Sequence, residues 1–200
     1  MSSARKVYTS VTHPIRIDWL DPSVAGPVGL TFAPGKKSIS LSGVRWDRDL
    51  DVDLTALIAQ GVGVLVCLLE DRDLAPNGIA DLFVQAEQHG LEVLRLPIPD
   101  QGVPADPGDV DRHLDALDAR VRAGSKVVIH CLGGLGRTGV IGGCWLIRRG
   151  LSADEALAML RQVRNDDRCP ETHGQRAFIE SYAVRLRERL AGGKASGSGQ

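Results

Sequence analysis

The segment from Val127 to Gly139 constrains this chain more than any other part of its sequence. A β-branched apolar run ends at His130 and Cys131, and Arg137 follows that cysteine after five residues, three of which are glycine. A strand that leads through a glycine-rich turn into a helix presents a ring of backbone N–H donors, and such a ring suits a phosphate dianion. The segment therefore predicts a strand, an anion-binding loop and a helix in direct succession.

Cys131 lies at the base of this predicted ring, where a thiol can lose its proton. The N–H donors and the helix dipole both stabilise negative charge, so Cys131 is the candidate nucleophile. The planar guanidinium of Arg137 matches the oxygens of a phosphate. The predicted phosphate-binding residues are Leu132, Gly133, Gly134, Leu135, Gly136 and Arg137. Because nucleophile and anion site adjoin, we expect in-line attack on phosphorus through a cysteinyl-phosphate intermediate.

Two residues that flank the loop have supporting roles in this hypothesis. His130 points away from Cys131 if the strand geometry persists, so we expect it to hold the loop by hydrogen bonds and not to act as a base. Thr138 can donate its hydroxyl to the sulfur and help it leave in the second step. Each also has an ordinary interpretation, as a buried histidine and as a residue in the first turn of a helix.

The leaving oxygen needs a proton donor, and Asp100 is the best candidate. It lies in the segment 97–104, which holds three prolines and a glycine in eight residues and cannot form regular structure. A hinged segment of this kind could bring the carboxyl over the site. Gln175 is a neutral residue able to position the water of the second step. The alternative for Asp100 is an aspartate that only forms a turn, and the alternative for Gln175 is a solvated helix residue.

Apolar residues recur with helical and strand spacing in alternation along the chain. The predicted helices cover residues 47–61, 77–88, 109–122, 138–149 and 172–190, a capping box at 152–155 opens one more, and the predicted strands cover 62–69, 91–96 and 126–129. This alternation favours an α/β fold of a single domain, with helices that flank a central, mainly parallel, twisted sheet. Ligands bind beyond the carboxyl ends of such strands, which is where Cys131 falls.

The composition argues against several classes of function. The formal net charge is −1, which predicts no general affinity for nucleic acid or for an anionic membrane. The four cysteines form no CxxC pair, so we expect neither a zinc site nor a disulfide framework. The N-terminus lacks the apolar core of a signal peptide. We therefore expect a monomeric, cytoplasmic protein whose anion site is local and which uses no metal or other cofactor.

Residues 130–139, His-Cys-Leu-Gly-Gly-Leu-Gly-Arg-Thr-Gly, resemble the signature loop of cysteine-dependent protein tyrosine and dual-specificity phosphatases. The upstream Ile98-Pro-Asp100 is similar to their mobile acid loop, and residues 46–50, 67–74 and 171–175 resemble the kinase-associated phosphatase (cyclin-dependent kinase inhibitor 3) branch. The resemblance covers roughly residues 36–185. It implies a dual-specificity phosphatase fold with Cys131 as nucleophile, Arg137 as phosphate ligand and Asp100 as acid.

The resemblance also implies a division of the chain. We expect residues 36–190 to form the phosphatase domain. The residues before it, 1–35, are broken by proline and glycine and are expected to form an irregular lead-in with short edge strands at 15–19 and 28–32. The tail over 191–200 is rich in glycine and serine, and we expect it to be disordered.

Regulation and substrate are further implications of the resemblance. Some relatives protect the nucleophile with a disulfide from the position of Cys67, so Cys67 is a candidate redox partner of Cys131, with core packing as the alternative. Phosphoinositide phosphatases of this superfamily place basic residues in the loop, whereas residues 132–136 contain none. The predicted function is hydrolysis of phosphotyrosine, and in a shallow cleft also of phosphoserine and phosphothreonine, on a phosphorylated protein.

The residues after the loop argue against one other interpretation of it, and two alternatives remain open. Gly134-x-Gly-x-x-Gly139 matches the dinucleotide fingerprint, but that motif needs an acidic residue that closes a second strand about 20 residues later. Here Asp154 and Glu155 begin a helix instead. A small phosphate ester remains an alternative substrate, and a non-catalytic phosphate-binding module remains an alternative to an enzyme.

Overall fold

The computed structural model describes residues 6–39 and 43–195, and its centre is a five-stranded sheet. Its strands, in spatial order, are β2 (Asp18–Trp19), β3 (Val28–Thr31), β8 (Lys126–His130), β6 (Val62–Cys67) and β7 (Glu92–Arg95). The last four run parallel to one another, and only β2 is antiparallel to the strand beside it. The predicted mainly parallel sheet is therefore confirmed.

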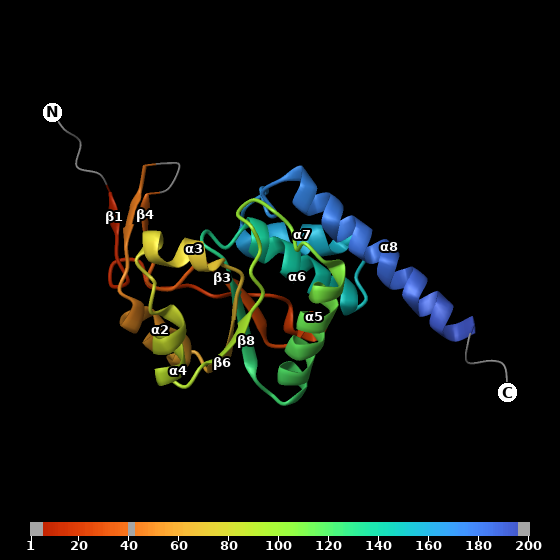
Figure 1. The fold of residues 1–200 in the computed structure, drawn as a ribbon, viewed down its shortest axis with the longest axis horizontal. Helices are drawn as coiled ribbons and strands as arrows, with labels where there is room; N and C mark the ends of the chain where they lie inside the picture. The colour runs from red at the N-terminus through yellow and green to blue at the C-terminus, as the bar shows by residue number, and fades with distance from the viewer. Residues whose placement is uncertain (1–5, 40–42, 196–200) are drawn as a thin grey trace.

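Helices cover both faces of this sheet (Figure 1). One face carries α5 (Pro107–Arg122), α6 (Gly136–Arg148), α7 (Ala153–Arg164) and α8 (His173–Ala195), and the other carries α2 (Leu50–Ala59) and α4 (Leu82–Gln88). Side chains alternate along β8, so Val127 and Ile129 pack toward α6 whereas Val128 packs toward α2. The result is a single mixed α/β domain with a core on each side of the sheet.

Shorter elements complete the fold. They are α1 (Pro22–Ala25), α3 (Asp71–Leu74), the 3₁₀ turn η1 (Ala75–Asn77), and a three-stranded sheet of β1 (Val7–Tyr8), β5 (Arg45–Asp47) and β4 (Lys37–Ile39). The small sheet lies at the N-terminal end of the molecule, opposite the end from which α8 projects (Figure 1). Its strand β5 leads into α2, so the small sheet helps to place the start of that helix.

The prediction of an edge strand at residues 28–32 was wrong. β3 pairs with β8 on one side and with β2 on the other, and its four residues are buried. A Cβ at Gly29 would lie 2.3 Å from Cγ2 of Ile17, so the missing side chain lets the segment around β2 fold over the strand. Residues 28–31 therefore form an interior strand, and it is β2, within the predicted strand at 15–19, that lies at the edge of the sheet.

Several helix boundaries also differ from the predicted ones. The helix expected from residue 77 begins at Leu82, because Gly78 takes a left-handed φ of 69° and separates it from η1. The helix expected from residue 47 begins at Leu50, since residues 45–47 form β5. The final helix α8 runs through Ala195, past its predicted end, and residues 196–200 of the predicted tail lie outside the described residues.

Candidate active site

The predicted strand, loop and helix are confirmed at the carboxyl end of β8. The strand ends at His130, α6 begins at Gly136, and the backbone N–H of Gly134 donates to Sγ of Cys131 at 3.1 Å. Gly134 has a φ of 75°, and a Cβ there would lie 2.5 Å from the carbonyl oxygen of Thr31. Only glycine fits this position, because the loop turns directly against the backbone after β3.

Arg137 lies in the first turn of α6, because this helix begins at Gly136, two residues before its predicted start at Thr138. Its side chain is 3% exposed, and Nη1 contacts Oδ2 of Asp73 at 2.8 Å and donates to the Ile98 carbonyl at 3.3 Å. Nη2 contacts Oδ1 of Asp100 at 2.9 Å. Burial alone would lower the pKa of Arg137, but the charges of Cys131, Asp73 and Asp100 raise it above its ordinary value. The guanidinium therefore stays charged beside the thiol.

Asp100 reaches the loop, as the sequence led us to expect. Its side chain is 64% exposed and forms the ion pair with Arg137 from a turn in which the N–H of Gly102 donates to the Pro99 carbonyl at 2.9 Å. The start of this segment is anchored, since the N–H of Ile98 donates to the Leu68 carbonyl at the end of β6. An exposed carboxylate on an anchored turn can exchange its arginine partner for a substrate.

Asp73 was not among the predicted site residues. It lies in α3, directly after β6, and its Oδ2 accepts from the N–H of Glu70 as well as contacting Arg137. The capping box formed with Glu70 fixes the carboxylate in place before any ligand binds. The usable signal in the sequence was its position just past a strand that neighbours β8, where side chains gather at the same edge of the sheet.

His130 is fully buried at the end of β8, and its role in holding the loop stays a prediction. Its Nδ1 lies 3.2 Å from the Cys131 carbonyl oxygen, to which a protonated Nδ1 donates. Burial lowers the pKa of His130 to about 4, so the imidazole is neutral at physiological pH. The hydroxyl of Thr138 is buried with no hydrogen-bond partner among the described residues, so the predicted bond to the Cys131 sulfur is not formed in this structure.

Gln175 lies at the beginning of α8 and is fully buried against the loop, not solvated. Its Nε2 donates to the Gly102 carbonyl at 3.0 Å, and its Oε1 accepts from the N–H of Thr172 at 3.1 Å. A Cβ at Gly136 would lie 2.9 Å from both polar atoms of the amide. Gln175 thus bridges the segment that carries Asp100 and the first residue of α6.

Cys67 is the last residue of β6 and lies opposite His130 in the strand register. Burial raises the pKa of its thiol to about 12, and all four cysteines of the chain are free. Cys67 packs with the core on the α2 side of the sheet, whereas Cys131 packs on the α6 side. No Cys67–Cys131 disulfide is present in this structure, and the redox pairing stays a prediction.

Lys36 is a second residue that the sequence did not single out. It is 5% exposed, and its ammonium donates to the Leu132 carbonyl of the loop at 3.2 Å. The segment 33–36 approaches the loop a second time through the N–H of Ala33, which donates to the same carbonyl at 3.3 Å. A lone lysine in a loop carries no periodic signal, so only the tertiary structure reveals this contact.

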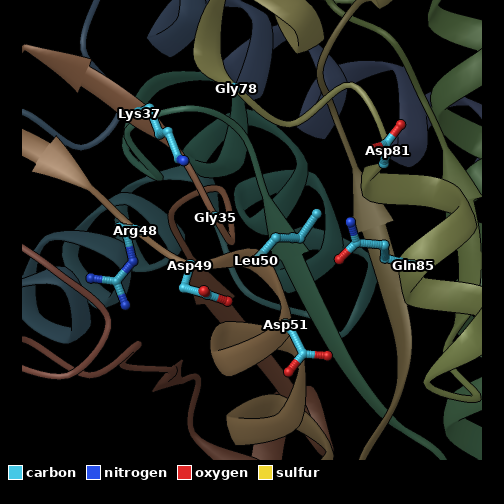
Figure 2. Close-up of a pocket in the computed structure, with 9 residues that line it drawn as sticks. All are labelled: Gly35, Lys37, Arg48, Asp49, Leu50, Asp51, Gly78, Asp81 and Gln85. Atoms are coloured by element: carbon cyan, nitrogen blue, oxygen red, sulfur yellow. The ribbon is translucent and has the colours of Figure 1, made fainter.

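A separate polar pocket of about 330 Å³ lies between α2 and α4 (Figure 2). Its lining consists of Gly35, Lys37, Arg48, Asp49, Leu50, Asp51, Gly78, Asp81 and Gln85, and includes no residue of the phosphate loop.

Among the residues described, no group of three or more histidine, cysteine or acidic side chains could hold a metal ion. Within the same residues, no helix is both long and apolar enough to span a membrane.

A cysteine whose sulfur accepts an N–H of its own glycine-rich loop, with a buried arginine and an aspartate paired to it, is the arrangement of a cysteine-dependent phosphatase. Comparison with known proteins agrees, since residues 43–151 match the family described as "Polymorphic toxin system, DSP-PTPase phosphatase". The chain is 30% identical over 183 residues to cyclin-dependent kinase inhibitor 3 of Rattus norvegicus, a match that covers 89% of this chain and 83% of the relative. It therefore belongs to the dual-specificity and protein tyrosine phosphatase family.

Solved structures agree with this assignment. A kinase associated phosphatase that carries serine in place of its catalytic site cysteine superimposes with a TM-score of 0.78 and 25% identity, over 86% of this chain and 96% of that one. The active form of Tk-PTP gives a TM-score of 0.66 and 31% identity, over 84% and 97% of the two chains. The predicted fold, the enzyme class and the protein phosphatase function are therefore confirmed.

Proposed function

We propose that this chain hydrolyses phosphate monoesters on protein side chains, with Cys131 as nucleophile, Arg137 as phosphate ligand and Asp100 as general acid. The observation that carries the assignment is the joint position of the three groups at one end of the sheet. The Cys131 sulfur accepts an N–H of the loop, and the Arg137 guanidinium contacts Asp100. This set provides nucleophile, charge stabilisation and proton donor without a further group.

In the first step the Cys131 thiolate attacks phosphorus in line with the ester oxygen. The S–P bond forms, the P–O bond to the substrate breaks, and the leaving oxygen takes a proton from Asp100. The phosphoryl oxygens take over the Nη2 edge of Arg137 that Asp100 occupies in this structure. Asp73 keeps its contact at Nη1, so the guanidinium stays oriented while its other partner changes.

In the second step water attacks the phosphorus of the cysteinyl phosphate. The P–O bond to water forms, the S–P bond breaks, and Asp100 takes the proton from the water. Thr138 would donate its unpartnered hydroxyl to the departing sulfur. Gln175 would position the water through the second N–H of Nε2 or the second lone pair of Oε1, which its bonds to the Gly102 carbonyl and the Thr172 N–H leave over.

The proposed substrate is a singly phosphorylated side chain of a protein. Loop residues 132–136 contain no lysine or arginine, so the loop offers no second cation for a multiply phosphorylated ring. Phosphotyrosine, phosphoserine and phosphothreonine all satisfy this condition. The similar structure named as a kinase associated phosphatase favours a phosphoprotein over a small phosphate ester.

Hydrolysis of an aryl phosphate with three forms of the protein tests this proposal. We expect turnover with the wild type, no turnover with Cys131→Ser, and a loss of about 10²–10⁴-fold with Asp100→Ala. The loss with Asp100→Ala should be larger for an alkyl ester than for an aryl ester, because a poor leaving group depends more on protonation. The pH profile of the activity of Asp100→Ala should also lose the basic limb that the wild type shows.

Several results would contradict the proposal. Wild-type protein that releases no phosphate but binds a phosphopeptide would be a non-catalytic phosphate-binding module. Turnover of small esters but not of phosphopeptides would make the substrate a small molecule. A basic limb retained in Asp100→Ala would move the general acid to another residue.

A further inference from the structure

Lys36 is a buried lysine whose ammonium contacts the phosphate loop at a carbonyl oxygen. Its Nζ lies 4.2 Å from the centre of the Trp46 ring and 4.7 Å from that of Phe32, and it donates to the Leu132 carbonyl at 3.2 Å. The two aromatic faces attract a cation and shield it from water. The ammonium is therefore directed at the loop and not at solvent.

The backbone around Lys36 is held by a second buried charge pair. Arg48 contacts Asp53 through two hydrogen bonds of 2.7 and 2.6 Å, and both side chains are at most 1% exposed. Asp53 also accepts from the N–H of Gly35 at 2.8 Å, and the N–H of Arg48 donates to the Lys36 carbonyl at 3.3 Å. Lys36 is thus carried on a rigid support, which a side chain with a precise placement requires.

The contact with Leu132 controls the orientation of a loop amide. The Leu132 carbonyl and the Gly133 N–H belong to one planar peptide group and point in opposite directions. Lys36 holds that carbonyl from outside, together with the N–H of Ala33 at 3.3 Å. The direction of the next N–H in the loop is therefore set before a phosphate arrives.

We propose that Lys36 is a positioning residue for the phosphoryl transfer: its ammonium fixes the Leu132–Gly133 peptide group and stabilises the Cys131 thiolate by its charge. This inference rests on the function proposed above. The thiolate raises the pKa of Lys36, and the same attraction acts in return on the thiolate, because coupling between two charges is mutual.

The cost of burying Lys36 argues against a purely structural role. Burial, together with the charges of Arg48 and Arg164, lowers the pKa of Lys36 to about 8, against the opposing effects of Cys131 and Asp53. A methionine would fill a similar volume without this desolvation cost. The fold therefore retains a charge that disfavours burial at a place where the chemistry needs one.

The test measures how fast iodoacetamide alkylates Cys131 between pH 5 and pH 9, with the modified site read by peptide mass spectrometry. Cys131 can be followed selectively, because burial raises the pKa of Cys67 and Cys169 to about 12 and strongly raises that of Cys144. We expect Lys36→Met to slow the reaction about threefold at pH 6 and to lower kcat for an aryl phosphate about tenfold. Lys36→Arg, which keeps the charge, should retain most of the alkylation rate and most of kcat.

Lys37→Met is the matched control. Lys37 is the next residue but lines the polar pocket between α2 and α4, a pocket that no loop residue lines (Figure 2). It should behave as the wild type. Lys36→Gln keeps an N–H donor without the charge, so slow alkylation in that variant as well would assign the effect to the charge.

The pH dependence provides an independent check. The difference between wild type and Lys36→Met should shrink above about pH 8, where Lys36 loses its proton. A difference that is constant with pH would overturn the charge effect, and equal behaviour of Lys36→Met, Lys36→Gln and Lys37→Met would overturn the inference. Wild-type protein that neither alkylates at Cys131 nor hydrolyses the aryl phosphate would instead refute the proposed function.

Discussion

Two ionisable side chains at the candidate active site, His130 and Lys36, are buried against the phosphate loop. Each contacts a carbonyl oxygen of the loop, His130 at Cys131 and Lys36 at Leu132. Both contacts use carbonyl oxygens of the loop and no loop N–H, so neither occupies a donor that an anion would need. At the scale of single residues, the loop is therefore held by side chains that do not themselves need to touch the substrate.

The burial of His130 predicts a specific pH dependence of stability. Its pKa is about 4 in the folded protein and about 6.5 in the unfolded chain, so between these values the unfolded state binds more protons. The free energy of unfolding should therefore fall as the pH drops from 6.5 toward 4. That slope is proportional to the number of protons taken up on unfolding, and His130→Gln should reduce this number by up to about one, as measured by urea unfolding across this range.

The same substitution at His173, an exposed residue at the beginning of α8, controls for the loss of an imidazole from the unfolded chain. If His130→Gln and the wild type have equal slopes, burial of His130 does not contribute to acid sensitivity. Because substitution of His130 also removes the contact to the Cys131 carbonyl, activity is not the readout here.

At the scale of elements, α6 carries the loop at its first turn and is buried along its length. Its glycines allow neighbouring elements to approach closely. A Cβ at Gly143 would lie 2.7 Å from Cδ1 of Ile179 in α8, and one at Gly142 would lie 3.1 Å from Leu160 in α7. The arginine in the first turn of α6 and the glutamine in the first turn of α8 are thus placed by the same helix packing.

Gly143→Ala should therefore destabilise the protein by about 1–3 kcal/mol, because the added methyl group overpacks the contact with Ile179. Gly192→Ala is the matched control, since Gly192 lies in α8 with no heavy atom within 4 Å of an added Cβ. It should leave stability unchanged or raise it by up to about 1 kcal/mol. Thermal unfolding of both variants gives the comparison, and equal effects would contradict the close packing of α6 on α8.

At the scale of the whole molecule, the segment before residue 36 is built into the sheet. β3 pairs with β8, whose end carries Cys131, and Asp18 of β2 contacts Arg164 of α7. The loop itself turns against the backbone at Thr31 through Gly134. The support of the active site therefore reaches back to residues that precede the expected phosphatase domain.

A chain shortened to residues 36–190 should consequently fail to fold cooperatively. It would lack β2 and β3, and it would expose the edge of β8 beside the phosphate loop. A chain of residues 6–195 keeps every described element and should unfold as the full-length protein does. Near-ultraviolet circular dichroism and thermal unfolding measure the difference. A cooperative transition in the shorter chain would show that residues 1–35 are dispensable.

The sequence alone predicted those parts of the site that depend on neighbours along the chain. The Cys131–Arg137 spacing, the glycine-rich turn and the following helix are local features, so strand and helix propensities were enough to place them. Asp100 followed from a proline-rich segment past the end of a strand. The alternation of helices and strands similarly predicted the α/β class and the mainly parallel sheet.

Only the tertiary structure decided which distant residues complete the site. Asp73 contacts the arginine of the loop across 64 residues of sequence, and Lys36 contacts the loop itself across 96. A short strand with a glycine, β3, carries no signal that tells an edge from an interior position. Both decisions depend on contacts between elements, and such contacts follow from how the whole core packs, not from the pattern of any one segment.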